Sequence, residues 1–179
     1  MHKYLLSLIL ILFILSACSL DVLGSDKLEN NKVKYVSLGS SFAAGPGVKG
    51  IAENSPDNCW QSDQNYARQL SERLNLDLID ASCIGAKLSD KTSPISIYSQ
   101  MENIQSDVGL VTLLAGGNDL GYLARLMTAS CENLVKQGKV HKTIPCLEMP
   151  KFPSIADYEN TEYHLNIITN AIKEKAPKA

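Results

Sequence analysis

The chain has 179 residues, which is enough for one domain with a substantial core and too few for two comfortable ones. Hydrophobic residues make up 45% of it and charged residues 20%, a balance typical of a globular protein rather than a disordered one. A formal net charge of −2 provides no basic field, which argues against nucleic acid as a partner.

The beginning of the chain has the pattern of an export signal. Lys3 gives a short positive region, and residues 5–15 form a nearly continuous apolar run, too short to span a bilayer comfortably. The run ends in "LSAC", which resembles the lipobox of bacterial lipoproteins. We therefore expect residues 1–17 to be a lipoprotein signal peptide, Cys18 to be lipidated, and residues 18–32 to form a tether. The protein would then be extracytoplasmic, lipid-anchored to a bacterial membrane in the periplasm or at the cell surface; an ordinary secretory signal and an uncleaved anchor are the alternatives.

After the tether, short apolar strands alternate with amphipathic helices. "VKYVSL" and "VGLVTLL" are apolar and rich in β-branched residues, as buried strands are, whereas "NYARQLSERL" places Tyr66, Leu70 and Leu74 at helical spacing. The predicted strands are 33–38, 76–79 and 108–114, and the predicted helices are 65–74, one that includes 100–103, and 158–175. This alternation indicates an α/β domain with a parallel sheet, whose ligand crevice lies outside the carboxyl ends of the strands.

Four cysteines follow the predicted lipidation site. An even number of cysteines in an exported chain predicts disulfides, for which three connectivities are possible. Pairing by proximity in the sequence gives Cys59–Cys83 and Cys131–Cys146. A zinc site is the rival interpretation, but no spacing is C-x-x-C and no histidine lies near the first pair. We expect disulfides and no metal.

Each predicted strand ends in a loop of small residues, "GSSFAAGPG", "SCIGA" and "GGND", and these loops would meet at one place. A phosphate site is one hypothesis, but neither the Walker pattern nor G-x-G-x-x-G follows the first strand. A flavin or nucleotide in a flavodoxin-like sheet remains a further alternative.

A serine nucleophile is the second hypothesis. Ser40 or Ser41 lies at the end of the first strand, where small neighbours leave room for a substrate carbonyl. Backbone N–H groups from this loop and from Gly85, together with the Asn118 carboxamide, would supply donors for an oxyanion. Glycine at position 85 would let the substrate oxygen approach the backbone closely.

In order and spacing, the three loops resemble blocks I, II and III of the SGNH (GDSL-type) hydrolases. The positions of the four cysteines also resemble the secreted lipase/esterase branch of that family. The resemblance covers the chain from about Val33 onward. It implies a three-layer α/β/α sandwich of the flavodoxin-like SGNH hydrolase fold around a five-stranded parallel sheet, hydrolysis of esters or acyl lipids, and no cofactor.

By this resemblance Ser41 is the nucleophile, and its N–H, the N–H of Gly85 and Asn118 form the oxyanion hole. The residues expected to support these loops are Gly39, Ser40, Gly116 and Asp119.

The sequence departs from the family pattern in two ways. Ser40 stands where many members carry Asp, and the D-x-x-H block that supplies the base is absent. Of the three histidines, His2 lies in the signal segment, and we expect His141 and His164 to be surface residues.

The last residues, "NAIKEKAPKA", resemble the end of the family's third large helix. We therefore expect residues 33–179 to be the N-terminal portion of the hydrolase domain, with a three-stranded sheet, an unpaired edge and an uncovered apolar face. Without the histidine, turnover should fall by about 10⁴ to 10⁶. The alternative is a non-catalytic hydrolase remnant that binds acyl chains or glycans.

Overall fold

A computed structural model describes residues 32–139 and 146–179. The predicted signal peptide, the lipidation site Cys18, nearly all of the tether, and His141 lie outside the described residues. Within the described ranges, no helix combines the length and the apolar character that crossing a bilayer requires.

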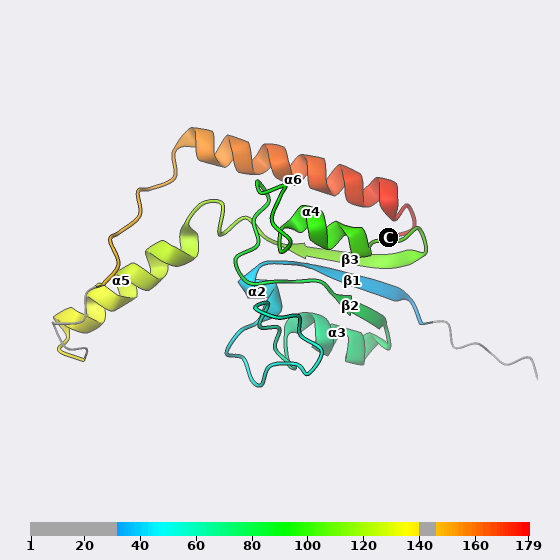
Figure 1. The fold of residues 1–179 in the computed structure, drawn as a ribbon, viewed down its shortest axis with the longest axis horizontal. Coiled ribbons are helices and arrows are strands. Elements are labelled where there is room, and N and C mark those ends of the chain that lie inside the picture. Colours follow the sequence, from blue (N-terminus) through cyan, green and yellow to red (C-terminus); the bar gives the residue numbers. More distant parts are fainter. Residues whose placement is uncertain (1–31, 140–145) are drawn as a thin grey trace, which may run out of the picture. The chain divides into compact units, whose positions relative to one another are not determined.

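The sheet consists of three parallel strands, β1 (Lys34–Gly39), β2 (Asp77–Asp80) and β3 (Val108–Leu114), in the order β2-β1-β3 (Figure 1). The three predicted strands are confirmed, with ends displaced by no more than one residue. The central strand β1 is buried from Tyr35 to Gly39. A strand covered on both faces needs side chains that are apolar or hydrogen-bonded at every position. For this reason the sequence of β1 shows no alternation of polar and apolar residues.

The helices form two layers around this sheet. Helix α3 lies on one face, and α4 and α6 lie on the other, which gives the predicted α/β/α arrangement (Figure 1). The helical segments are α2 (Ser41–Ala44), α3 (Tyr66–Leu74), α4 (Ile97–Gln100) with the 3₁₀ turn η1 (Met101–Asn103), α5 (Tyr122–Lys136) and α6 (Ile155–Lys175).

Side-chain caps explain where the predicted helices begin. The Asn65 side chain accepts the N–H of Arg68 at the start of α3. Ser154 and Asp157 form a capping box at the start of α6, so this helix begins three residues before its predicted start at 158. Sequence analysis missed α5, whose N-cap is Gly121 in the left-handed region with no side-chain cap.

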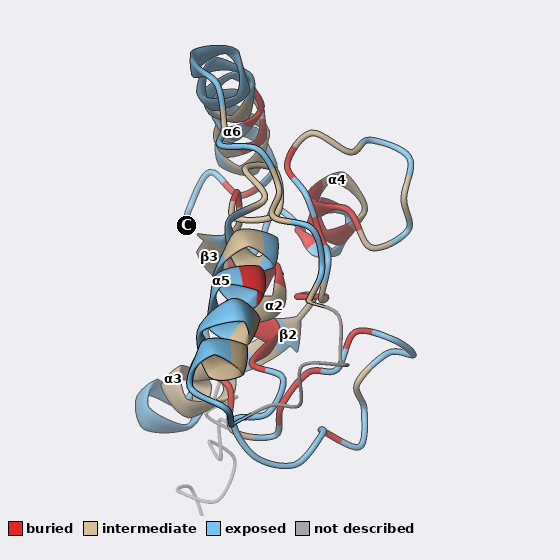
Figure 2. Cartoon of the chain, turned by 90° about the vertical axis from the view of Figure 1, so that its left-hand side faces the viewer, coloured by how far each residue is buried: buried red, intermediate tan, exposed pale blue. Residues whose placement is uncertain are grey.

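The apolar core lies between the sheet and the layer of α4 and α6, where Figure 2 shows the inner surfaces of these helices buried. Val36 and Leu38 of β1 meet Ile97 of α4 and Ile168 of α6, all fully buried. The α3 face is different in character, because hydroxyl groups pair across it. The pairs are Tyr35–Thr112 at 2.8 Å, Tyr66–Thr112 at 2.9 Å and Ser37–Tyr66 at 3.1 Å. Burial raises the pKa of the Tyr35 phenol, which therefore stays protonated in this network.

The outer edge of β3 is open in the described part of the chain, since β3 pairs there with β1 alone. Leu114, the last residue of this strand, is 45% exposed. The unpaired edge expected from the sequence is therefore confirmed for the described residues, whereas the uncovered apolar face stays a prediction, since helices lie on both faces of the sheet.

Both predicted disulfides are present, Cys59–Cys83 and Cys131–Cys146. The zinc interpretation is therefore wrong, because each thiolate that it needs is bonded to another cysteine. The first disulfide is buried and joins the α2–α3 connection to the loop after β2. Disulfides persist in oxidising compartments, in agreement with an extracytoplasmic location.

We predict that the two disulfides contribute unequally to the stability of the sheet. The double substitution Cys59→Ala with Cys83→Ala should lower the free energy of unfolding by about 3 kcal/mol, because it frees a loop of 24 residues beside the core. Urea unfolding followed by far-UV circular dichroism measures this loss.

The matched control is Cys131→Ala with Cys146→Ala. This pair ties down α5, which buries only Thr128, so the main transition should keep its midpoint. Equal shifts from the two pairs would contradict the prediction.

Candidate active site

The turn after β1 places two serines beside the end of β3. Gly39 ends the strand, and the N–H of Ser40 donates to the Leu114 carbonyl at 3.0 Å. A Cβ on Gly39 would lie 2.5 Å from that carbonyl oxygen and 2.5 Å from Ala43 Cβ. No other residue fits this position, which is the physical reason for the glycine at the end of the first strand.

The two serines differ in exposure. Ser40 is 2% exposed, whereas Ser41 is half-buried and lines a cavity of about 280 Å³. The cavity walls are mainly apolar: the other lining residues are Phe42, Gly45, Pro46, Val48 and Leu123. Only Ser41 of the pair therefore faces a space where a substrate would fit.

The second loop reaches the first through backbone hydrogen bonds. The Cys83 N–H donates to the Gly39 carbonyl at 3.0 Å, and the Ala86 N–H closes a tight turn onto the Cys83 carbonyl at 3.3 Å. Gly85 lies in this turn with φ of +78°, a conformation that glycine adopts without strain, and it is exposed.

The third loop is bonded to the second. The Asn118 side chain donates to the Ala86 carbonyl at 3.0 Å, and the Asp119 carboxylate accepts the N–H groups of Leu88 and Ser89 at 3.0 and 2.9 Å. The structure thus brings all three predicted loops together at the carboxyl end of the sheet. Gly116 is buried at the base of the third loop, with φ of +103°.

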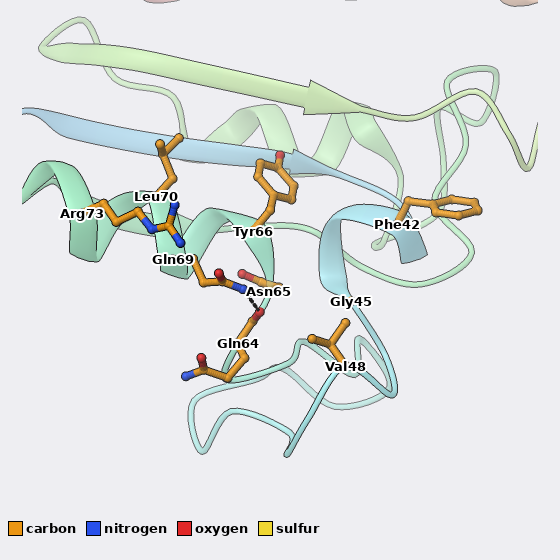
Figure 3. A pocket seen from close by; sticks show the side chains of 9 residues that line it. All are labelled: Phe42, Gly45, Val48, Gln64, Asn65, Tyr66, Gln69, Leu70 and Arg73. Atoms are coloured by element: carbon orange, nitrogen blue, oxygen red, sulfur yellow. Dashed lines mark hydrogen bonds between the residues drawn. The ribbon is translucent and has the colours of Figure 1, made fainter.

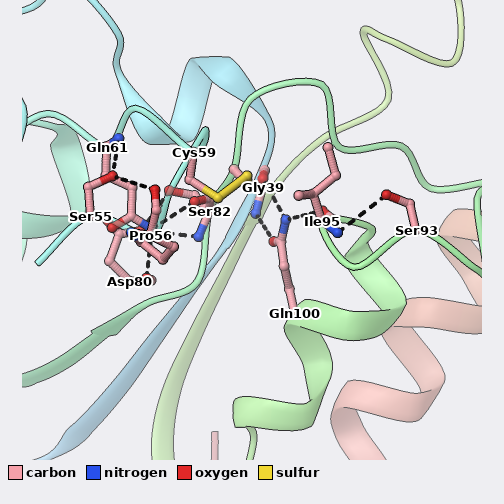
Figure 4. The surroundings of a disulfide bond; sticks show 11 residues. Gly39, Ser55, Pro56, Cys59, Gln61, Asp80, Ser82, Ser93, Ile95 and Gln100 are labelled. Atoms are coloured by element: carbon pink, nitrogen blue, oxygen red, sulfur yellow. Dashed lines mark hydrogen bonds between the residues drawn. A yellow bond between two sulfur atoms is a disulfide. The ribbon is translucent and has the colours of Figure 1, made fainter.

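Sequence analysis missed Gln100, a buried residue whose amide bonds the backbone of Gly39 and Ile95 (Figure 4). No local pattern distinguishes this glutamine, because its partner Gly39 is 61 residues away in the chain.

The expected surface position of His164 is wrong. It is 9% exposed, and a hydrogen bond of 3.2 Å joins its Nδ1 to the Tyr98 hydroxyl across the interface of α6 and α4. Its ring also packs edge-on against Tyr98 and Tyr163. Burial raises the pKa of the Tyr98 phenol. In the described part of the chain, no hydrogen bond joins Ser41 to a histidine.

A larger hollow of about 460 Å³ adjoins the cavity at Ser41 (Figure 3). The two share Phe42, Gly45 and Val48. The far wall of the larger hollow is formed by α3 and the residues before it, with Tyr66 and Leu70 on the side of the sheet.

Comparison with curated proteins finds bacterial lipases. Lipase 2 of Streptomyces coelicolor is 32% identical over 99 residues, which cover 53% of this chain and 32% of that protein. A lipase of Streptomyces rimosus is 28% identical over 103 residues, which cover 55% of this chain and 35% of that protein. The matched region thus spans about a third of the length of these relatives.

Comparison with solved structures supports the fold. The phospholipase A1 from Streptomyces albidoflavus NA297 has a TM-score of 0.58 at 24% identity, over 83% of this chain and 57% of that one. The extracellular lipase from Streptomyces rimosus has a TM-score of 0.57 at 20% identity, over 82% and 57%. Both share the parallel sheet with flanking helices.

A family model matches most of the chain, including the three loops. It matches residues 37–179, from the middle of β1 through α6. The chain belongs to the GDSL-like lipase/acylhydrolase family.

Proposed function

We propose that this chain carries the nucleophile and the oxyanion hole of a serine hydrolase that cleaves acyl esters. The observation that carries the proposal is the convergence of the three loops, which are bonded to one another at one end of the sheet. Family membership and the names of the Streptomyces relatives support the same class of reaction.

In this proposal Ser41 attacks the ester carbonyl. Its exposure to the cavity favours it over the buried Ser40. The attack gives a tetrahedral oxyanion, the alcohol leaves, and water then hydrolyses the acyl-enzyme. The supporting residues are Gly39, Ser40, Gly116 and Asp119, which fix the loops.

Three donors would stabilise the oxyanion. Ser41 is the first residue of α2, and its N–H has no acceptor within the helix because the first N–H groups of a helix have none. The Gly85 N–H belongs to an exposed turn, and Asn118 uses one amide hydrogen on the Ala86 carbonyl and keeps a second for the substrate. Donors held in place before the reaction act on the transition state at little reorganisation cost.

The substrate class follows from the cavity at Ser41. Phe42, Val48 and Leu123 line it with apolar surface, which suits an acyl chain better than a sugar or a charged group. A lipid on Cys18 would hold this site beside membrane lipids. The anchor is proposed from the sequence, and the mainly apolar cavity supports it because such a cavity suits the acyl chains of membrane lipids.

Among residues 32–139 and 146–179, no histidine is placed to act as the general base for Ser41. The sequence contains no D-x-x-H, and His164 is engaged with Tyr98 rather than with Ser41. This observation favours a second candidate function, an acyl-binding protein without turnover. With the described residues alone, acceleration would come from the oxyanion hole, and acylation should be slow.

We predict that a fluorophosphonate probe labels the protein slowly and at Ser41. Labelling should be lost in Ser41→Ala and kept in the matched control Ser40→Ala, since the second hydroxyl is buried. Mass spectrometry of the labelled peptide identifies the modified residue. Complete absence of labelling in the folded protein would favour the acyl-binding function, and labelling that survives Ser41→Ala would refute the assigned nucleophile.

We further predict that Asn118→Ala lowers the turnover of p-nitrophenyl acetate by about 10²- to 10³-fold with little change in KM, because the donor acts on the transition state. Asn133→Ala on the exposed side of α5 is the control and should leave turnover unchanged. A loss smaller than about threefold would be too small for an oxyanion donor, whose removal costs far more.

A further inference from the structure

The last residue of α4, Gln100, is 5% exposed, and its side chain is directed at the end of β1 (Figure 4). Its Oε1 accepts the Gly39 N–H at 2.8 Å, and its Nε2 donates to the Gly39 carbonyl at 3.0 Å. The amide therefore pairs with both polar groups of one peptide residue.

This pairing continues the β1 ladder beyond the end of β2. The last regular pair is Ser37 with Asp80, after which the Ala81 N–H still donates to the Ser37 carbonyl at 2.9 Å. Beyond that point the chain runs to the Cys59–Cys83 disulfide, and the Cys83 N–H still donates to the Gly39 carbonyl at 3.0 Å. Gly39 lies two residues after Ser37, so its N–H and carbonyl point to the same side of β1. The Oε1 of Gln100 takes the place of the carbonyl on the β2 side that would have accepted the Gly39 N–H, and its Nε2 shares the Gly39 carbonyl with the Cys83 N–H.

A third hydrogen bond extends the link to the second loop. The Nε2 of Gln100 also donates to the Ile95 carbonyl at 3.0 Å. The side chain of Ile95 lies against the Gly85 turn, because its Cδ1 is 3.6 Å from where a Cβ on Gly85 would be. One buried amide thus connects the backbone that precedes Ser41 to the residue that supports Gly85.

We propose that Gln100 is a positioning residue that fixes the separation between Ser41 and the Gly85 N–H. The inference rests on the proposed function, since it concerns the same site. Only a primary amide offers one acceptor and two donors at this length. A glutamate at position 100 would accept the Gly39 N–H but would also place a carboxylate against two carbonyl oxygens.

The test compares Gln100→Met with two other glutamine substitutions. Gln61→Met removes an equally buried amide, which donates to the carbonyls of Asp80 and Ser82 at 2.8 and 2.7 Å without touching Gly39 (Figure 4). Gln105→Met alters an exposed side chain. The readouts are hydrogen exchange at the Gly39 amide by NMR and the kinetics of fluorophosphonate labelling, separated into the binding constant and the first-order step.

In Gln100→Met the Gly39 amide should exchange faster, and the first-order labelling step should slow by about tenfold or more with an unchanged binding constant, because small misplacements of reacting groups are costly. Gln61→Met should lower stability comparably and leave both readouts near those of the parent protein. Gln100→Glu should retain part of the Gly39 protection yet label as slowly as Gln100→Met, which keeps the test valid if the methionine variant does not fold.

Three results would overturn the inference. Equal effects of Gln61→Met and Gln100→Met on labelling would mean that Gln100 contributes only to general stability. Unchanged hydrogen exchange at the Gly39 amide in Gln100→Met would mean the same. If the parent protein does not label while Gly39 exchange responds to Gln100→Met, the hydrogen bonds hold but the proposed function fails, and the positioning role fails with it.

Discussion

The close contact at the end of β1 is the constraint on which the rest of the site depends. The chain turns from β1 into α2 directly against the end of β3, where a side chain on Gly39 would lie 2.5 Å from the Leu114 carbonyl oxygen. This turn presents Ser41 at the edge of the sheet, where the loops after β2 and β3 also emerge. A backbone hydrogen bond from Cys83 to Gly39 fixes the loop after β2, and the Asn118 and Asp119 side chains bond the loop after β3 to it. The site is thus built from the main chain and short side chains, which lose little conformational entropy when they are ordered.

Local sequence patterns predicted the parts of the fold that local physics decides. Strands β1 and β3 were predictable because they are mainly apolar runs, and α3 because its apolar residues recur at helical spacing. Helix α5 was not predictable by the same means. It lacks a side-chain cap at Gly121, so no capping residue marks its start, and its apolar residues Tyr122, Leu126 and Met127 remain exposed instead of joining the core.

Some residues of the candidate site were predictable from local sequence patterns and others were not. Ser41, Gly85 and Asn118 each follow a predicted strand, and parallel strands bring their carboxyl ends to one edge. Gln100 and His164 were beyond prediction, because their partners lie 61 and 66 residues away in the sequence. The disulfide pairing agreed with proximity in the sequence, although proximity alone left other connectivities open.

The proposed oxyanion site would thus be assembled before substrate arrives, and no histidine of the described residues is bonded to Ser41. The central claim is that the three loops act on one oxygen atom. The most direct measurement is a crystal structure of the protein after reaction with a dialkyl p-nitrophenyl phosphate, which releases p-nitrophenol as the dialkyl phosphoryl group is transferred to Ser41. The account predicts a phosphoryl oxygen at about 2.7–3.1 Å from the Ser41 nitrogen, the Gly85 nitrogen and Asn118 Nδ2. A phosphoryl oxygen directed into solvent, or bound to only one of these donors, would contradict it.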